Sequence, residues 1–144
     1  MTYTERPGDL FTASPNSYLV HCISADFMMG AGIAKEFRNR GVKQYLESNY
    51  NMIWDGRGYT LFAPMTGFNG VFNLITKERY FLKPTYGSLK EALHDLKNQL
   101  PEGSNLAMPH IGCGLDKLSW LTVKEIICDI FADTNINITV YGGK

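Results

Sequence analysis

The chain has 144 residues, of which 44% are hydrophobic and 19% charged, the balance of an ordinary globular domain. Its 14 basic and 14 acidic side chains cancel, so no basic field exists that could hold a nucleic-acid backbone by charge alone. A phosphate group would have to be bound locally, by backbone N–H groups and helix N-termini. No run approaches the roughly 18 apolar residues of a membrane span, and residues 1–7 lack the apolar stretch of a secretory signal.

The cysteine count points to a reducing compartment. Cys22, Cys113 and Cys128 are an odd number, and no pair has CxxC spacing. The three histidines and three cysteines show no metal-ligand spacing either, so we expect no metal, and the chemistry considered below needs no organic cofactor. We therefore expect a soluble, cytoplasmic, monomeric protein with one domain over residues 1–144, no membrane contact and no strong nucleic-acid binding.

Strand and helix patterns alternate along the chain. The predicted strands are the apolar or alternating runs 18–23, 59–64, 71–76, 106–109 and 136–141. The predicted helices are 33–41, with Gly41 as a stop, then 42–51, 88–100 and 119–132. The runs 59–64 and 71–76 flank a glycine-bearing loop, which indicates adjacent strands. This order predicts an α/β fold with a largely parallel sheet and helices on both faces.

Two glycine-bearing loops follow predicted strands and are the main candidates for a phosphate site. The first loop contains Gly30, Ala31, Gly32 and Ile33, just before a predicted helix. The second loop contains Ile111, Gly112, Cys113, Gly114 and Leu115. Either loop alone could be a tight turn, but two such loops at the same edge of a sheet can close on one diphosphate from opposite sides. The GxGxxG fingerprint of dinucleotide-binding enzymes is absent, because Lys35 stands at its third glycine.

Four side chains near these loops allow alternative interpretations. Asp9 could cap the next turn or accept a hydrogen bond from an adenine amino group. Lys77, at the end of a strand, could reach solvent, or it could point into a cleft, where desolvation would favour the nucleophilic amine. His21 is interpreted as a satisfied core histidine rather than a base. Cys113 is interpreted as a small structural residue rather than a nucleophile.

Six short motifs occur in order along the chain: GDLF (8–11), HCIS (21–24), MGAGIA (29–34), LITK (74–77), KPTY (83–86) and PHIGCGLD (109–116). As a set they resemble the macro domain family, from about residue 3 to residue 141. The branch that they resemble most contains the terminal ADP-ribose protein glycohydrolases and the related ADP-ribose 1″-phosphate phosphatases.

The resemblance implies a three-layer α/β/α fold, with a mixed, largely parallel sheet and ADP-ribose lying across the strand ends. Asp9 would match the aspartate that reads the adenine amino group, with Leu10 beside it. Residues 30–33 would lie at the distal ribose and diphosphate, and residues 111–115 would face them. Ser24 would match a polar group near the distal ribose.

The resemblance also implies a chemistry. In the glycohydrolase branch a lysine and an aspartate act on the distal ribose, and the matching positions are Lys77 and Asp116. Lys77 would attack C1″ of the ring-opened sugar to form a Schiff base, and Asp116 would act as base while water releases ADP-ribose from an acidic side chain. A 1″-phosphatase and a non-catalytic ADP-ribose reader remain alternatives, although the presence of both residues argues against the reader.

Two stretches depart from the family pattern. Residues 54–69 match no motif of the family. Residues 80–82, Tyr-Phe-Leu, are more apolar than expected before the KPTY motif. They could reshape the mouth of the site, and they leave the identity of the leaving group open.

Overall fold

The computed structural model describes residues 1–51 and 54–142. Its strands are β1 (Thr2–Arg6), β2 (Ser17–Ser24), β3 (Tyr59–Ala63), β4 (Gly70–Lys77), β5 (Asn105–Met108) and β6 (Asn137–Tyr141). Its helices are α1 (Gly32–Asn39), α2 (Val42–Asn49), α3 (Tyr86–Gln99) and α4 (Trp120–Phe131), with a short 3-10 helix η1 (Leu10–Thr12). Within these ranges no helix is long and apolar enough to cross a membrane.

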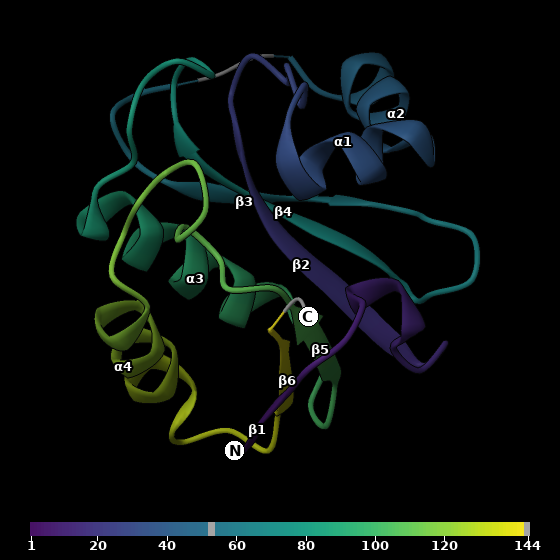
Figure 1. The fold of residues 1–144 in the computed structure, drawn as a ribbon, viewed down its shortest axis with the longest axis vertical. Helices are drawn as coiled ribbons and strands as arrows, with labels where there is room; N and C mark the ends of the chain where they lie inside the picture. Colours follow the sequence, from purple (N-terminus) through teal and green to yellow (C-terminus); the bar gives the residue numbers. More distant parts are fainter. Residues whose placement is uncertain (52–53, 143–144) are drawn as a thin grey trace.

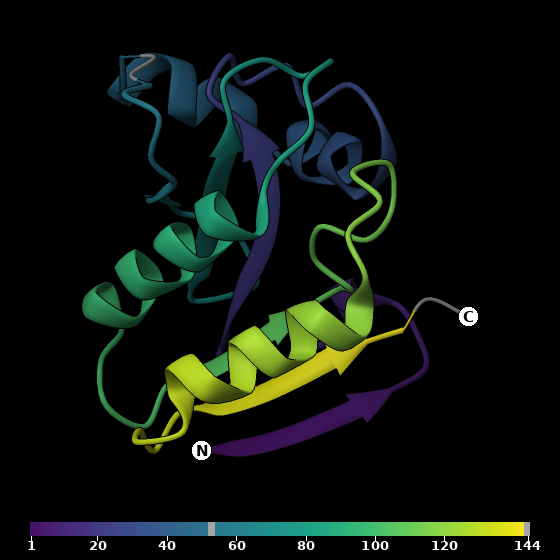
Figure 2. The same cartoon turned by 90° about the vertical axis from the view of Figure 1, so that its left-hand side faces the viewer.

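In the described part of the chain, six strands form one sheet in the order β1-β6-β5-β2-β4-β3. Every neighbouring pair is parallel except β3 and β4, which are antiparallel. Figure 2 shows β1 and β6 running in the same direction at one edge of the molecule. The predicted mixed, largely parallel sheet is confirmed, as is the adjacency of the two strands around residues 67–70.

The helices cover both faces of this sheet (Figure 1). On one face α3 and α4 bury a core that includes Leu93, Leu96 and Ile127. On the other face α1 and α2 bury a second core that includes Phe37 and Leu46. Two cores on opposite faces of one sheet give the three-layer α/β/α architecture that the sequence predicts.

The centre of the sheet explains where a ligand can bind. The chain leaves β2 toward α1 on one face, and it leaves the neighbouring strand β5 toward α4 on the other face. Neighbouring parallel strands whose connections diverge in this way open a crevice beyond their carboxyl ends. Strand β2 is buried on both sides, as its continuous apolar run requires, so this crevice has a rigid floor.

Strand β1 was missed by the sequence prediction. Its five residues are mostly exposed and polar, so they carry no apolar alternation. The strand exists because its backbone pairs with β6 from Thr2 opposite Asn137 to Arg6 opposite Tyr141. Such an edge strand is specified by its partner rather than by its own side chains.

Helix boundaries differ by one or two residues from the predicted ones. Helix α3 begins at Tyr86 instead of Ser88, because Thr85 caps it. The Thr85 hydroxyl accepts the Ser88 N–H at 2.9 Å, and the Ser88 hydroxyl accepts the Thr85 N–H at 3.1 Å. This reciprocal capping box fixes the first turn of the helix. Helix α2 ends at Asn49 rather than at residue 51.

Candidate functional site

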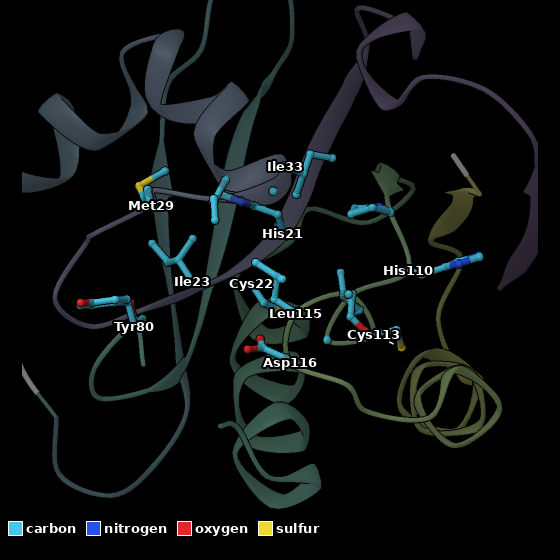
Figure 3. A pocket seen from close by; sticks show the side chains of 18 of the residues that line it. His21, Cys22, Ile23, Met29, Ile33, Tyr80, His110, Cys113, Leu115 and Asp116 are labelled. Atoms are coloured by element: carbon cyan, nitrogen blue, oxygen red, sulfur yellow. Dashed lines mark hydrogen bonds between the residues drawn. The ribbon is translucent and has the colours of Figure 1, made fainter. Parts of the chain in front are cut away.

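A cavity of about 930 Å³ occupies the crevice at the carboxyl ends of β2, β4, β5 and β6 (Figure 3). This volume is within the range of pockets that hold a small-molecule ligand. Twelve predicted site residues line this cavity: Ser24, Gly30, Ala31, Gly32, Ile33, Lys77, Ile111, Gly112, Cys113, Gly114, Leu115 and Asp116. Asp9 and Leu10 do not line it.

The first glycine loop ends at the N-terminus of α1. Gly32 is the first residue of the helix, with φ of 60°, a conformation that favours glycine. Its N-cap, Ala31, supplies no side-chain hydrogen bond, so the N–H groups of the first turn are left uncapped by it. Uncapped N–H groups and the positive end of the helix dipole make this loop suited to an anion.

The second glycine loop is held in shape by its own backbone. The Cys113 N–H donates to the His110 carbonyl at 3.2 Å, and the Leu118 N–H donates to the Gly112 carbonyl at 2.8 Å. Gly112 has φ of 74°, and a Cβ there would lie 3.0 Å from Leu118 Cδ1. A Cβ at Gly32 would lie 4.0 Å from Leu115 Cδ1, so the two loops meet across the cavity.

Lys77 and Asp116 form an ion pair at the cavity wall. Lys77 Nζ donates to Asp116 Oδ1 at 2.6 Å, and the two side chains are only 12% and 14% exposed. Lys77 ends β4 and Asp116 belongs to the loop after β5, so the fold brings together residues 39 positions apart. The interpretation in which Lys77 reaches solvent is therefore wrong.

The cysteines of the cavity are protonated thiols. Burial raises the pKa of Cys113, and its Sγ–H donates to the Ile111 carbonyl at 3.3 Å. Burial, and then the charge of Asp116, raise the pKa of Cys22 far above its usual range. Because the thiolate is the reactive form, these environments favour a structural role for both residues.

His21 lies beneath the cavity and is fully buried. The Asn73 amide donates to the Leu61 carbonyl at 3.0 Å, so its oxygen accepts from His21 Nε2, at 2.6 Å. The ring stacks on Phe37 with its centroid 3.9 Å away. The expectation of a fully satisfied core histidine is correct for burial but wrong for hydrogen bonding, since Nδ1 has no partner among the described residues.

This environment makes His21 a source of acid sensitivity. Burial lowers the pKa of His21 from 6.5 to about 4. Between these values the unfolded chain binds a proton that the folded chain excludes, so stability is complete above pH 6.5 and falls toward pH 4. The free energy of unfolding should fall by about 3 kcal/mol over this range. Urea unfolding at pH 7.0 and 4.5 should show it, and His21→Gln, which keeps a donor for Asn73, should flatten the dependence. An equal loss in the variant would exclude His21 as the cause.

Asp26 does not line the cavity but supports its rim, and sequence reasoning missed it. Its Oδ1 accepts from the Ser24 hydroxyl at 2.5 Å and from the Met28 N–H at 3.0 Å, and its Oδ2 accepts from the Tyr80 N–H at 2.9 Å. Burial opposes its ionisation, but these hydrogen bonds and the charge of Arg79 hold its pKa below the usual range. Asp26 thus ties together the two loops that form one rim of the cavity. The only signal in the sequence is an aspartate two residues after a strand end.

The mouth beside this rim is apolar, as residues 80–82 suggested. The exposed apolar side chains at or beside it are Met28, Tyr80, Phe81, Leu82 and Leu115. In Figure 3 Tyr80 and His110 lie at opposite ends of the cavity view. Tyr80 donates its N–H to Asp26, which accepts from the Ser24 hydroxyl. Ser24 pairs with Lys77 in the sheet, so the apolar mouth lies beside the Lys77 end of the cavity.

Asp9 and Leu10 lie at the start of η1, outside the lining of the cavity. The Asp9 carboxylate accepts the Phe11 N–H at 2.9 Å and caps η1, which confirms the capping interpretation. Leu10 is buried in the core beneath α1 and α2. The cavity extends to Tyr141 and Gly142, and the Gly142 N–H donates to the Arg6 carbonyl at 2.9 Å, three residues before Asp9.

Comparisons with known proteins identify the architecture and the family. No family model matches the sequence. The macrodomain of DarG from Mycobacterium tuberculosis has the same fold, with a TM-score of 0.79 at 20% identity over 99% of both chains. A protein named ADP-ribose glycohydrolase OARD1, from Bos taurus, is 41% identical over 98% of this chain and 90% of its own length. This chain belongs to the macro domain family.

Within the macro domain family, the relative from Bos taurus indicates the glycohydrolase branch. A further structure, of DarTG from Thermosipho africanus in complex with ADP-ribose, has a TM-score of 0.71 at 20% identity. That match covers 97% of this chain and 41% of the other. Among the described residues no group of three histidine, cysteine or acidic side chains could hold a metal ion.

Proposed function

We propose that this macro domain binds ADP-ribose and hydrolyses derivatives at C1″ of the distal ribose, releasing ADP-ribose from acidic side chains of proteins. The observation that carries the proposal is the Lys77–Asp116 ion pair, which lies in the wall of the cavity between the two glycine loops. A pure binding module would need neither a nucleophile nor a base at this point. The name of the relative from Bos taurus, an ADP-ribose glycohydrolase, supports the same activity.

The cavity suggests how the ligand lies. The diphosphate would sit between the N-terminus of α1 and the loop at Gly112, where backbone N–H groups supply the hydrogen bonds. The distal ribose would then reach Ser24, Lys77 and Asp116. The adenine would extend to the other end, toward Gly142 and the segment that carries Asp9.

The chemistry would proceed in two stages. Asp116 takes a proton from the Lys77 ammonium, and the free amine attacks C1″. The bond from C1″ to the carboxylate oxygen breaks, and the carboxylate leaves with the electron pair and takes the proton that Asp116 held. The sugar ring then opens as a proton passes from the Lys77 nitrogen to the ring oxygen, which gives a protonated imine on Lys77. Asp116 then helps water to add at the imine carbon, so that the amine leaves and ADP-ribose closes its ring again.

Product analysis with two substrates tests this function. The protein is incubated with a glutamate-linked ADP-ribosyl protein and, separately, with ADP-ribose 1″-phosphate. The proposal expects free ADP-ribose from the first substrate. Phosphate release from the second substrate alone would favour the phosphatase, and binding of ADP-ribose without turnover of either substrate would leave only the reader.

Asp9 offers a test of the adenine end. Asp9→Ala should weaken ADP-ribose binding by about 1–3 kcal/mol, since a charged acceptor for the adenine amino group is lost. The inosine analogue lacks that amino group, so its binding should not change. Asp9→Asn keeps a good cap and controls for local folding. Calorimetry in which Asp9→Ala weakens both ligands equally would remove Asp9 from the adenine contact.

We further propose a ligand class, an oligomeric state and a cellular compartment. The partner would be ADP-ribose or an ADP-ribosylated protein, and the protein would act as a monomer. The cysteines at positions 22, 113 and 128 are free thiols, which supports a reducing compartment such as the cytoplasm.

A further inference from the structure

The KPTY motif, residues 83–86, has no part in the chemistry described above, yet it contacts the loop that carries Asp116 at two points. Lys83 Nζ donates to the Leu115 carbonyl at 2.7 Å, immediately before Asp116. The Ser119 N–H donates to the Tyr86 hydroxyl at 3.0 Å, three residues after Asp116. The two contacts therefore bracket the aspartate.

The same segment also contacts the strand that carries Lys77. The Ser88 hydroxyl, in the first turn of α3, donates to the Thr76 carbonyl at 2.7 Å, and this contact is buried. Thr76 directly precedes Lys77. Residues 83–88 thus touch the backbone next to Lys77 and on both sides of Asp116, and the capping box at Thr85 holds the start of α3 in place.

The loop around Asp116 has backbone hydrogen bonds of its own, from Leu118 to Gly112 and from Lys117 to Gly114, and the contacts from Lys83 and Tyr86 add to them. Leu115 is 65% exposed, so its side chain does not anchor the loop in the core. Lys117 has φ of 63°, a left-handed conformation that a residue with a side chain adopts at a cost. Contacts from outside the loop therefore help to keep a strained backbone in one geometry.

We propose that Lys83 and Tyr86 are positioning residues that hold the Asp116 loop against Lys77, so that the two reacting groups stay in contact during turnover. This inference rests on the proposed function. Misplacement of a reacting group by about 1 Å can lower a rate about 100-fold without emptying the pocket. The predicted signature is therefore a loss in kcat with little change in ligand affinity.

Tyr86→Phe is the cleaner test, because Tyr86 does not line the cavity whereas Lys83 does. It should lower kcat on the glutamate-linked substrate about 10-fold while the Kd for ADP-ribose stays within about twofold. Tyr50→Phe is a matched control, since it removes another tyrosine hydroxyl bonded to backbone, here donating to the Phe62 carbonyl at 2.8 Å far from the loop. The control should leave both quantities unchanged.

Variants of Lys83 provide a second test. Lys83→Met, which keeps the stem and loses the donor, should lower kcat about 10-fold or more, and Lys83→Arg should restore most of it because a guanidinium also donates. A rise in Kd with unchanged kcat in Lys83→Met would show that Lys83 binds ligand instead, and it would overturn the positioning role of Lys83.

Amide hydrogen exchange of residues 112–119 measures how often the loop opens, and it does so independently of turnover. Tyr86→Phe should speed exchange in this segment, and Tyr50→Phe should not. Unchanged exchange, or faster exchange with wild-type kcat, would overturn the proposal. If the wild-type protein turns over no substrate, the proposed function fails, while exchange still decides whether Tyr86 holds the loop.

Discussion

Replacement of Lys77 by alanine is expected to lower turnover of a glutamate-linked ADP-ribosyl protein by at least about 1,000-fold, because the reaction loses its nucleophile. Binding of ADP-ribose should persist, since backbone N–H groups of the two loops would hold the diphosphate. Borohydride should trap a covalent adduct in the wild-type protein and none in Lys77→Ala, because only an imine is reduced to a stable amine.

Two further variants sharpen this result. Lys77→Arg should be as inactive as Lys77→Ala, because a guanidinium stays protonated and cannot attack C1″. Asp116→Ala should be slow, because Asp116 assists both stages, and the adduct should accumulate if the attack of water is slowed more than the attack of Lys77. A Lys77→Ala protein that is active on ADP-ribose 1″-phosphate, with no trapping in the wild type, would exclude the lysine mechanism and support the 1″-phosphatase.

Gly32→Val should weaken ADP-ribose binding at least about 100-fold while the fold persists. At φ of 60° a β-branched residue is strained, and its side chain would occupy the space at the start of α1 where the diphosphate is proposed to lie. Calorimetry measures the affinity, and circular dichroism with thermal unfolding checks the fold.

Gly103 provides the matched control for this change. It has φ of 76° and open space around its Cβ position, but it lies in the turn before β5, at the opposite ends of the strands. Gly103→Val should therefore cost a similar backbone strain, of about 1–2 kcal/mol, and leave the affinity unchanged. If both variants lose affinity equally, the loss reflects folding, and the first loop is not part of the binding site.

The order of strands and helices could be predicted because the spacing of apolar residues along the chain reflects which face of each element is buried. Strand β2 and helix α3 are buried elements, and their patterns placed them within one or two residues. Strand β1 could not be found in this way, because backbone pairing with β6 specifies it and most of its side chains face solvent. The capping box at Thr85 was readable in principle, as a threonine three residues before a serine.

Part of the site could likewise be predicted from the sequence, and part could not. The two glycine loops could be placed on one edge of the sheet, because each follows a parallel strand. The contact between Lys77 and Asp116 depends on tertiary structure, and local sequence left open whether Lys77 reached solvent. Asp26 and Tyr86 act through hydrogen bonds to backbone groups of other loops, and such contacts leave no local pattern. Positive φ explains only some of the loop glycines, since Gly32 and Gly112 have positive φ whereas Gly30 and Gly114 do not.

The pairing of β1 with β6 makes the beginning of the chain a structural part of the ligand cavity. Arg6 ends β1, and its carbonyl holds the Gly142 N–H at the end of the cavity away from Lys77. Removing β1 would expose β6 as a bare sheet edge, a surface prone to self-association, and would release that end of the cavity. Lys77 and Asp116, held by other strands, would keep their places. A protein without β1 would then bind its ligand weakly, although Lys77 and Asp116 would keep their relative positions. Different strands of the sheet therefore support the nucleotide-binding end of the cavity and the end where the sugar would react.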